Sequence, residues 1–209
     1  MIFNALNFVP SRVSAACEFL CRRGRLLRLM LLLRRATEAD PPHIRTLAEH
    51  IWRDSYAQMI SAEQIHYMLS WMYAPHKLLS EIRRGVVYEL AELDGLPVGY
   101  LAWELLPAAT AHLHKLYLLP EFQARGFGRQ MLRHVQENAL QAGAGRLELR
   151  VNKANLRARR AYERAGLQVT GVLVTDIGGG FVMDDFAMSK PLTVPTEPSQ
   201  SGTDNPPYG

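Results

Sequence analysis

Cysteine is almost absent from this sequence. The 209 residues include two cysteines, Cys17 and Cys21, and both lie near the amino end. Residues 31–192 therefore cannot form a disulfide framework or a cysteine-ligated metal site. The same segment has no cysteine nucleophile, which excludes a ping-pong route through an acyl-cysteine within it.

Long apolar runs are also absent, and so is a net charge on the main part of the chain. No stretch approaches the roughly 18 apolar residues that a membrane-spanning helix needs. Residues 1–29 contain five arginines and one glutamate, which account for the whole formal charge of +4. The remaining 180 residues carry 19 basic and 19 acidic groups. We therefore expect no membrane span, no nucleic-acid partner and a cytoplasmic location.

The two ends differ in composition from the middle of the chain. Residues 1–30 are rich in arginine and poor in acid, and we expect either a disordered extension or an over-extended start site. A targeting helix is the alternative. Residues 193–209 are rich in Pro, Ser, Thr and Gly, which predicts a disordered tail. One domain over residues 31–192 lies between them.

Expected strands and helices alternate along this domain. The apolar patterns predict strands over residues 31–36, 86–93, 98–105, 111–118, 146–151, 167–174 and 181–188. They predict a helix that begins after an N-cap at Asp40 and another that begins after a capping box at Ser61. They also predict a short helix that ends near Arg84, and helices over 127–142 and 156–165. Asp94-Gly95 is typical of a hairpin turn. This order indicates an α/β fold in which a mixed sheet carries helices on both faces.

Two glycines stand where an expected strand passes into an expected helix. Gly126 and Gly128 have no Cβ, so a ligand can approach the backbone closely. The N–H groups at a helix start lack intrahelical partners and carry positive partial charge, to which Arg125 and Arg129 add. Such a cradle suits a phosphate or pyrophosphate. A Gly-x-Gly pair can also be a plain turn, and neither a Walker loop nor the three-glycine dinucleotide motif is present.

A second block follows the next expected strand. Its members are Asn155, Ala158, Tyr162 and Gly166, with Leu167 after the last glycine. Together with Gln-x-Arg-Gly-x-Gly over residues 123–128, this block resembles the GCN5-related N-acetyltransferase (GNAT) superfamily, in which Phe is usual at the position of Leu167. The resemblance covers residues 31–192. It implies a central, mostly antiparallel sheet with splayed parallel strands, and acetyl-CoA as cosubstrate.

The resemblance also assigns roles to individual residues. Tyr162 would protonate the leaving thiolate, since a phenol with a pKa near 10 can exchange a proton with a thiol; the alternative is a core aromatic residue. The Leu118 N–H would face the thioester oxygen. The acetyl-CoA site would comprise Leu116, Tyr117 and Leu118, the loop residues Gln123, Ala124, Arg125, Gly126, Phe127, Gly128 and Arg129, and Asn155.

Two histidines supply the candidate general base. His112 and His114 alternate along one expected strand and should share a face. His112 lies where several superfamily members place a catalytic glutamate, and histidine titrates in the range that suits an ammonium proton. Glu104 acting through a water is the rival, and a structural role for His112 is the alternative. The His-x-His pair has no evident third ligand, so we expect no metal site.

Acidic and aromatic residues mark the expected acceptor side. Asp176, Asp184 and Asp185 flank the glycine-rich turn between the last strands, and with Glu104 they would attract a cationic amine. A solvated rim is the alternative. Aromatic and methionine side chains over residues 56–73 would form either core or the wall of an acceptor pocket.

The sequence thus predicts an N-acetyltransferase that moves acetyl from acetyl-CoA directly to a primary amine through a ternary complex. The acceptor would be a small amine or a protein amine. The alternative is a non-catalytic acyl-CoA-binding or sensing domain. A homodimer is compatible with either interpretation.

Overall fold

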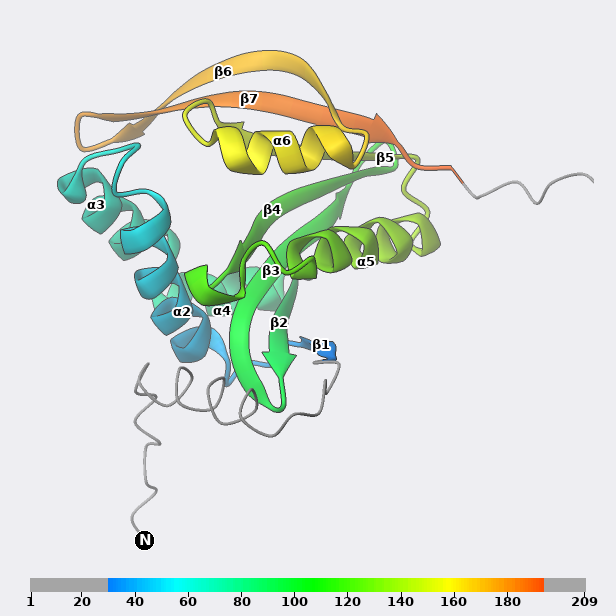
Figure 1. Cartoon of the computed structure of the whole chain (residues 1–209), viewed down its shortest axis with the longest axis horizontal. Coiled ribbons are helices and arrows are strands. Elements are labelled where there is room, and N and C mark those ends of the chain that lie inside the picture. The colour runs from blue at the N-terminus through cyan, green and yellow to red at the C-terminus, as the bar shows by residue number, and fades with distance from the viewer. Residues whose placement is uncertain (1–29, 194–209) are drawn as a thin grey trace, which may run out of the picture.

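The computed structural model describes residues 30–193, where helices surround a seven-stranded sheet (Figure 1). The strands are β1 (Leu31–Arg35), β2 (Val87–Leu93), β3 (Leu96–Leu106), β4 (Thr110–Leu118), β5 (Arg146–Asn152), β6 (Gln168–Gly178) and β7 (Phe181–Pro191). The helices are α2 (Pro41–Ser55), α3 (Ala62–Met72), α4 (Pro75–Arg83), η1 (Pro120–Phe122), α5 (Phe127–Gln141) and α6 (Leu156–Arg164). The sheet order is β1-β2-β3-β4-β5-β7-β6. Only β4 and β5 are parallel neighbours, which confirms the predicted mixed, mostly antiparallel sheet.

Local sequence signals explain several element boundaries. Asp94 and Gly95 have φ values of 50° and 77°, as a tight hairpin turn between β2 and β3 requires. Ser61 caps α3, because its Oγ accepts a hydrogen bond from the Gln64 N–H at 3.1 Å. Both features were predicted from short-range sequence, and both are confirmed.

The predicted side-chain cap by Asp40 is wrong, although α2 does begin after that residue. The Asp40 carboxylate instead accepts hydrogen bonds from the Thr37 N–H at 2.7 Å and from the Arg34 guanidinium at 2.9 and 3.1 Å. Burial alone would raise the pKa of Asp40, but these hydrogen bonds outweigh it and lower the pKa to about 2. The carboxylate therefore ties β1 to the turn before α2 rather than capping the helix.

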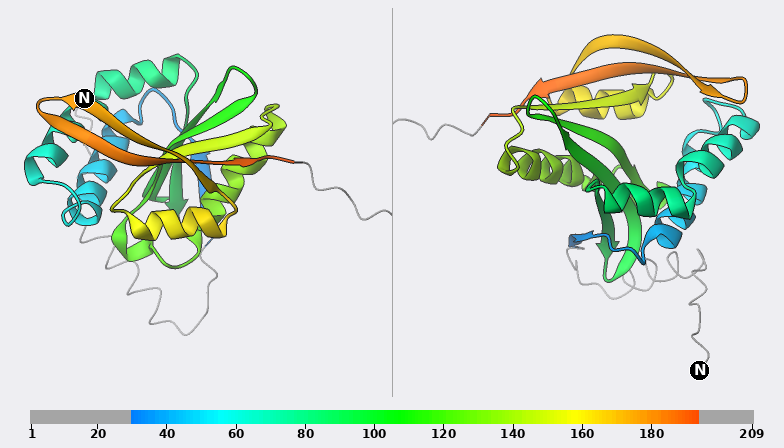
Figure 2. Two further views of the ribbon diagram at one scale, coloured as in Figure 1. Left: turned by 90° about the horizontal axis from the view of Figure 1, so that it is seen from above. Right: turned by 180° about the vertical axis from the view of Figure 1, so that it is seen from behind.

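Helices cover both faces of the sheet, as predicted. Lys115 of β4 pairs with Glu81 of α4 at 3.4 Å, so the side chains on that side form what we call the α4 face. His134 of α5 lies 3.0 Å from Glu89 of β2, whose side chain points to the opposite side, the α5 face. The view from behind shows α4 in front of the strands and α5 beyond them (Figure 2).

The parallel strands β4 and β5 separate part of the way along their length. Their pairing runs only from Thr110 to Leu113 on β4 and from Arg146 to Leu149 on β5. Immediately beyond it, β3 pairs Trp103 with Leu113 and Ala102 with Lys115, so His114 is an extra residue, a β-bulge. From the bulge onward β4 is hydrogen-bonded only to β3. We call this separation the splay, and it confirms the predicted splayed parallel strands.

The β6–β7 hairpin extends beyond the rest of the sheet and reaches α3 (Figure 1). The Tyr67 hydroxyl of α3 donates a hydrogen bond to the Ile177 carbonyl at 2.7 Å, and Gln64 Nε2 donates to the Val182 carbonyl at 2.8 Å. Gly179 lies against this contact, because a Cβ there would stand 2.9 Å from the Tyr67 ring. These contacts hold the hairpin tip beside the acceptor wall expected from residues 56–73.

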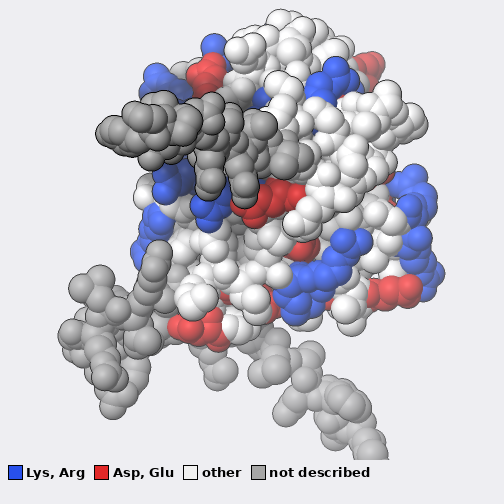
Figure 3. All heavy atoms as spheres, turned by 90° about the vertical axis from the view of Figure 1, so that its right-hand side faces the viewer, with Lys and Arg blue, Asp and Glu red and all other residues white. Residues whose placement is uncertain are grey.

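The predictions for the two ends concern residues that, apart from Met30 and Thr193, lie outside the described part of the chain. Within residues 30–193, no helix is both long and apolar enough to cross a membrane. Lys and Arg side chains are interspersed with Asp and Glu on the face shown in Figure 3.

Candidate active site

The last residues of β4 direct backbone hydrogen-bonding groups into the splay. The Leu119 N–H donates to the Val98 carbonyl of the β3 side at 2.9 Å. Because antiparallel strands alternate between inward and outward groups, the N–H and C=O of Leu118 and Leu116 point away from β3. They point to the side on which β5 no longer pairs with β4. The role expected for the Leu118 N–H requires this orientation but is not tested by it.

Close packing by β3 fixes this edge. A Cβ on Gly99 would stand 2.4 Å from the Tyr117 carbonyl oxygen and 2.7 Å from Leu118 Cδ2. Only glycine allows β3 to approach the end of β4 this closely. Gly99 was not singled out from the sequence, because nothing local distinguishes it from other strand glycines.

The predicted anion cradle lies at the start of α5. Gly126 is the N-cap and has a φ of 88°, and Ala124 before it has a φ of 60°. The first helical hydrogen bond joins the Gln130 N–H to the Gly126 carbonyl, so the N–H groups of Phe127, Gly128 and Arg129 have no intrahelical partner. No acidic residue occupies the first turn, and no side chain within residues 30–193 caps this end.

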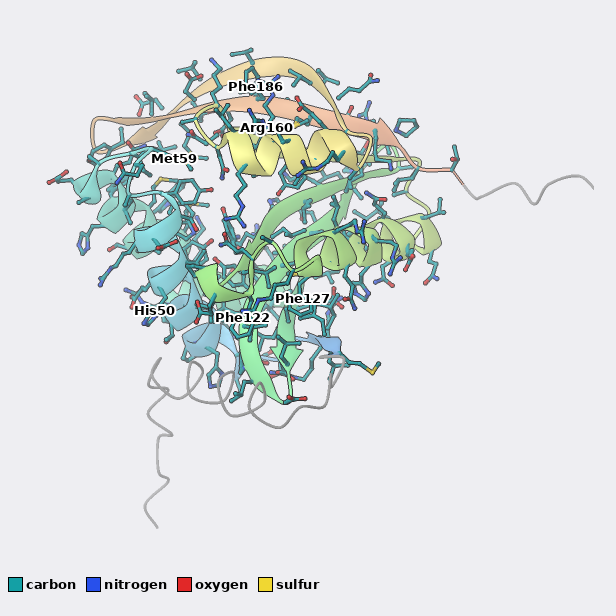
Figure 4. All side chains as sticks on the ribbon, in the orientation of Figure 1. His50, Met59, Phe122, Phe127, Arg160 and Phe186 are labelled. Atoms are coloured by element: carbon teal, nitrogen blue, oxygen red, sulfur yellow. The ribbon has the colours of Figure 1, made fainter. Side chains whose placement is uncertain are left out.

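A buried aromatic ring anchors the loop that leads into the cradle. Phe122 of η1 is buried, and the Arg125 guanidinium lies 5.7 Å from the centre of its ring. In Figure 4, Phe122 and Phe127 mark η1 and the start of α5, and Arg160 marks α6 above them. The loop is thus fixed by packing beneath it, while its N–H groups remain directed outward.

Gln123 joins both borders of the splay, a role that the sequence did not predict. Its Nε2 donates to the Leu118 carbonyl at 2.8 Å, and its Oε1 accepts a hydrogen bond from Arg157 of α6. Both ends of the Gln123 amide are therefore engaged by the protein. The assignment of Gln123 to the acetyl-CoA site can rest on its backbone, while its side chain links β4 to α6.

Tyrosines gather where α2, β4 and α6 meet. The hydroxyls of Tyr56 and Tyr117 lie 3.3 Å apart, and the Trp52 ring stacks on Tyr56 with centroids 4.6 Å apart. Asn155 caps α6, because its Oδ1 accepts from the Ala158 N–H at 3.0 Å, and its side chain lies next to the Tyr56 hydroxyl. Tyr162 lies near enough to Tyr56 for that phenol, after burial, to raise the pKa of Tyr162. The structure thus brings Tyr162 to this group.

The environment of Tyr162 alters the pKa expected for it. Burial is the largest influence and raises the pKa of Tyr162 above its ordinary value near 10. The pKa of the Tyr162 phenol is therefore further above that of a thiol than the sequence suggested. The consequence is a phenol that stays protonated and can donate its O–H. No side chain or carbonyl within residues 30–193 hydrogen-bonds to that hydroxyl.

The two histidines lie together, each with its own carboxylate. His112 Nδ1 is 3.2 Å from Glu148 Oε1 of β5, and His114 Nε2 is 2.8 Å from Glu104 Oε1 of β3. Their rings meet edge to face with centroids 4.6 Å apart. Burial, with the neighbouring His112 second, lowers the pKa of His114. Glu148 was missed because its partner is 36 residues away, and only the β4–β5 register brings them together.

Within residues 30–193 no group of three or more His, Cys, Asp or Glu side chains could hold a metal ion. The structure does not bring His112 into contact with Tyr162. His112 precedes Leu116 by four residues on β4, roughly 13 Å along an extended strand. A base at His112 would reach the end of the splay only through water.

The acidic residues expected on the acceptor side have different environments. Asp176 Oδ1 accepts from the Gly178 N–H at 2.8 Å and belongs to the hairpin turn. Asp184 is half-exposed and forms an ion pair with Lys153. Asp185 is buried, with 3% of its surface exposed. Burial raises the pKa of Asp185, partly offset by Arg150.

Comparison with known proteins gives consistent matches. A family model described as "Acetyltransferase (GNAT) family" matches residues 45–167. An uncharacterized N-acetyltransferase of Archaeoglobus fulgidus is 35% identical over 97 residues, which span 44% of this chain and 65% of that protein, just under two thirds of its length. The spermidine N(1)-acetyltransferase of Thermoplasma acidophilum is 26% identical over 157 residues, 73% of this chain and 94% of that one. The crystal structure of the PaiA N-acetyltransferase of T. acidophilum, in complex with coenzyme A, superposes with a TM-score of 0.66 at 25% identity and covers 78% of this chain and 99% of that one.

Proposed function

The chain belongs to the acetyltransferase (GNAT) family, and we propose that it transfers acetyl directly from acetyl-CoA to a primary amine within a ternary complex. The observation that carries this proposal is the splay. Its border includes the N–H groups of Leu116 and Leu118, which point away from β3; the uncapped start of α5 follows β4, and Tyr162 lies near Tyr56.

The residues present fit acetyl-CoA. The Phe127, Gly128 and Arg129 N–H groups, with Arg125, would bind the pyrophosphate at the positive end of α5. Leu116, Tyr117 and Leu118 would bond the pantetheine arm through their backbone, and Asn155 would lie beside its end. The T. acidophilum structure, which contains coenzyme A, supports acetyl-CoA as the cosubstrate. Acetyl-CoA would supply the activated acetyl group.

Each chemical step has a residue suited to it. The amine nitrogen forms a bond to the thioester carbon while the C–S bond breaks. The Leu118 N–H stabilises the negative charge that develops on the carbonyl oxygen. Tyr162 donates its proton to the departing sulfur, and solvent later restores that proton. The proton of the amine passes through water to His112 Nε2, while Glu148 accepts a hydrogen bond from His112 Nδ1 and fixes the tautomer.

The acceptor side favours a cationic amine. It is bordered by the tyrosine group, by the hairpin tip and by the carboxylates of Glu104, Glu148 and Asp185. Spermidine is the first acceptor to test, because the T. acidophilum relative, which this chain matches over 94% of that protein's length, is a spermidine N(1)-acetyltransferase. A protein N-terminus or lysine is the other acceptor class.

The test is thiol release from acetyl-CoA in the presence of a panel of primary amines, with the acetylated product identified by mass spectrometry. Turnover with at least one amine, and formation of its N-acetyl product, would support the proposal. Tight acetyl-CoA binding without turnover on any amine or peptide would instead support an acyl-CoA-binding or sensing role.

A further inference from the structure

Asp185 differs from the other acidic residues that the sequence assigned to the acceptor side in having no partner within residues 30–193. Glu104 pairs with His114, Asp184 with Lys153, and Asp176 with the Gly178 N–H. Among residues 30–193, nothing donates a hydrogen bond to Asp185 or forms an ion pair with it, although only 3% of its surface is exposed. A largely buried carboxylate without a partner in the protein is costly, because it has lost much of its hydration.

The strand register places Asp185 across the splay from the end of β4. Asp185 pairs with Asn152 of β5, three residues beyond Leu149, where the pairing of β5 with β4 ends. Leu116 lies three residues beyond Leu113, the corresponding end on β4. Asp185 therefore stands at about the level of Leu116, on the opposite border of the opening.

The Asp185 side chain faces the acceptor side. Paired residues on neighbouring strands share a face, so Asp185 and Asn152 lie on the same face as Glu148 and its partner His112, the α4 face. The next residue, Phe186, points the other way, where Arg159 of α6 lies 4.9 Å from its ring centre. Asp185 is also near Tyr56, because its charge raises the pKa of that hydroxyl.

The charged groups around Asp185 do not neutralise it by contact. Arg150 and Lys153 favour its ionised form through space, and Asp184 opposes it. Lys153 is already paired with Asp184. Arg150 is exposed, on the strand next to β7. Burial outweighs both cations and raises the pKa of Asp185. A bound cation would supply the missing hydrogen bonds.

We propose that Asp185 is the anchor for the ammonium group of the acceptor, and that it selects charged aliphatic amines over uncharged acceptors of the same shape. The inference rests on the proposed acetyl transfer. The carboxylate accepts a hydrogen bond from the ammonium and holds the nitrogen opposite Leu116 until the proton leaves. Asp185 binds the acceptor, whereas Tyr162 and His112 transfer protons.

The experiment compares two acceptors with wild-type protein and Asp185→Asn. One acceptor is a linear primary alkylamine, which is charged at neutral pH. The other is an O-alkylhydroxylamine of the same length, which is uncharged there. For Asp185→Asn we expect KM for the alkylamine to rise about 10²-fold, the range for a lost hydrogen bond to a charged group. KM for the O-alkylhydroxylamine should stay within twofold, and acetyl-CoA affinity should not change.

Asp184→Asn is the matched control, since it makes the same chemical change on the opposite face. It should leave both acceptors unaffected. An equal loss of kcat on both acceptors would assign Asp185 to proton transfer and overturn the anchor. No loss on either acceptor, or a loss accompanied by weaker acetyl-CoA binding, would also overturn it. If the wild-type protein acetylates neither acceptor nor any amine of the panel, the proposed function itself fails.

Discussion

His112 Nδ1 and Glu148 Oε1 lie 3.2 Å apart across the only parallel pair of neighbouring strands in the described sheet. In-register parallel pairing sets the two residues side by side just before β4 and β5 separate. A carboxylate at this distance favours a proton on Nδ1, which leaves Nε2 as the ring nitrogen able to accept one. A paired histidine at the base of the splay is therefore available to the proposed chemistry.

Removal of the proposed base, His112, should change the pH dependence of turnover. His112→Ala should flatten the acidic limb of the kcat/KM profile, because the base must be unprotonated to work. Glu148→Gln should lower kcat less, because the amide still touches the ring but no longer stabilises its positive charge. Glu49→Gln, which alters an ion pair with Arg45 on α2, is the control. An unchanged acidic limb in His112→Ala would leave Glu104 or water as the base.

Removal of the Tyr162 hydroxyl should lower the rate of acetyl transfer without weakening acetyl-CoA binding. Tyr162→Phe keeps the ring and should lower kcat roughly 10²-fold, within the range for general acids. Acetyl-CoA affinity measured by calorimetry should stay the same. Tyr100→Phe, which removes a buried hydroxyl bonded to Tyr73 at 2.8 Å, is the control and should affect stability more than kcat. Normal turnover in Tyr162→Phe, with chemistry rate-limiting, would contradict the assignment.

Side chains added to the cradle should weaken acetyl-CoA binding. Gly128→Val is the cleaner substitution, because its Cβ would meet only Leu118 Cδ1 at 3.9 Å. We expect its melting temperature to be nearly unchanged and its acetyl-CoA Kd to rise at least tenfold. Gly126→Val should also cost about 1–2 kcal/mol of folding free energy, because residue 126 has a φ of 88° that L-residues disfavour. Unchanged affinity in Gly128→Val would refute the pyrophosphate role.

A methyl group at Gly99 should disturb the end of β4. The added Cβ would stand 2.4 Å from the Tyr117 carbonyl oxygen, so the two strands must move apart. Gly99→Ala should lower stability by about 1–3 kcal/mol, as overpacking does. It should also weaken acetyl-CoA binding, because Leu116 and Leu118 would shift. Gly145→Ala is the control, since its Cβ would meet no atom within 4 Å. Equal midpoints of chemical denaturation for the two variants would contradict this prediction.

Asp185→Asn should stabilise the unliganded protein, and more so at higher pH. Burial raises the pKa of Asp185 in the folded state, so its ionised form is penalised by folding. The penalty is present above the folded pKa and disappears as the pH falls through it. The gain in melting temperature of Asp185→Asn should therefore be larger at pH 8 than at pH 4. About 1–3 kcal/mol is the range for an unsatisfied buried group. A variant less stable than wild type at pH 8 would show that the carboxylate stabilises the fold.

Sequence alone predicted the parts of the site that depend on near neighbours. The Asp94-Gly95 turn, the Ser61 cap and the glycines at the start of α5 act within a few residues, so composition and spacing reveal them. Asp40 shows the limit of such rules, because the correct residue type at the correct position bonds Arg34 instead of the helix. An ion pair with the preceding strand β1 competed with the helix cap.

The contacts that sequence did not predict depend mostly on how elements far apart in the chain pack together. Glu148 reaches His112, and Gln123 reaches Arg157, over more than 30 residues. The sequence grouped Asp185 with Asp176 and Asp184. Only the pairing of β7 with β5 shows that Asp185 and the exposed Asp184 lie on different faces of the sheet. Alternation along a strand assigns faces, yet a single extra residue reverses the assignment, and no sequence pattern located the extra residue in β4.

The extra residue, His114, makes the length of β4 as important as its composition. On either side of it the strand alternates in opposite phase, so Leu113 points to the α5 face and Lys115 to the α4 face. Deletion of the extra residue would leave a regular ladder, with Tyr117 still paired with Tyr100, but it would remove the local bend and twist that the bulge gives β4 next to the splay. Homologous chains that retain this chemistry should therefore tolerate substitutions at position 114 but not a gap there. Changes in length should be confined to loops such as the one between β3 and β4.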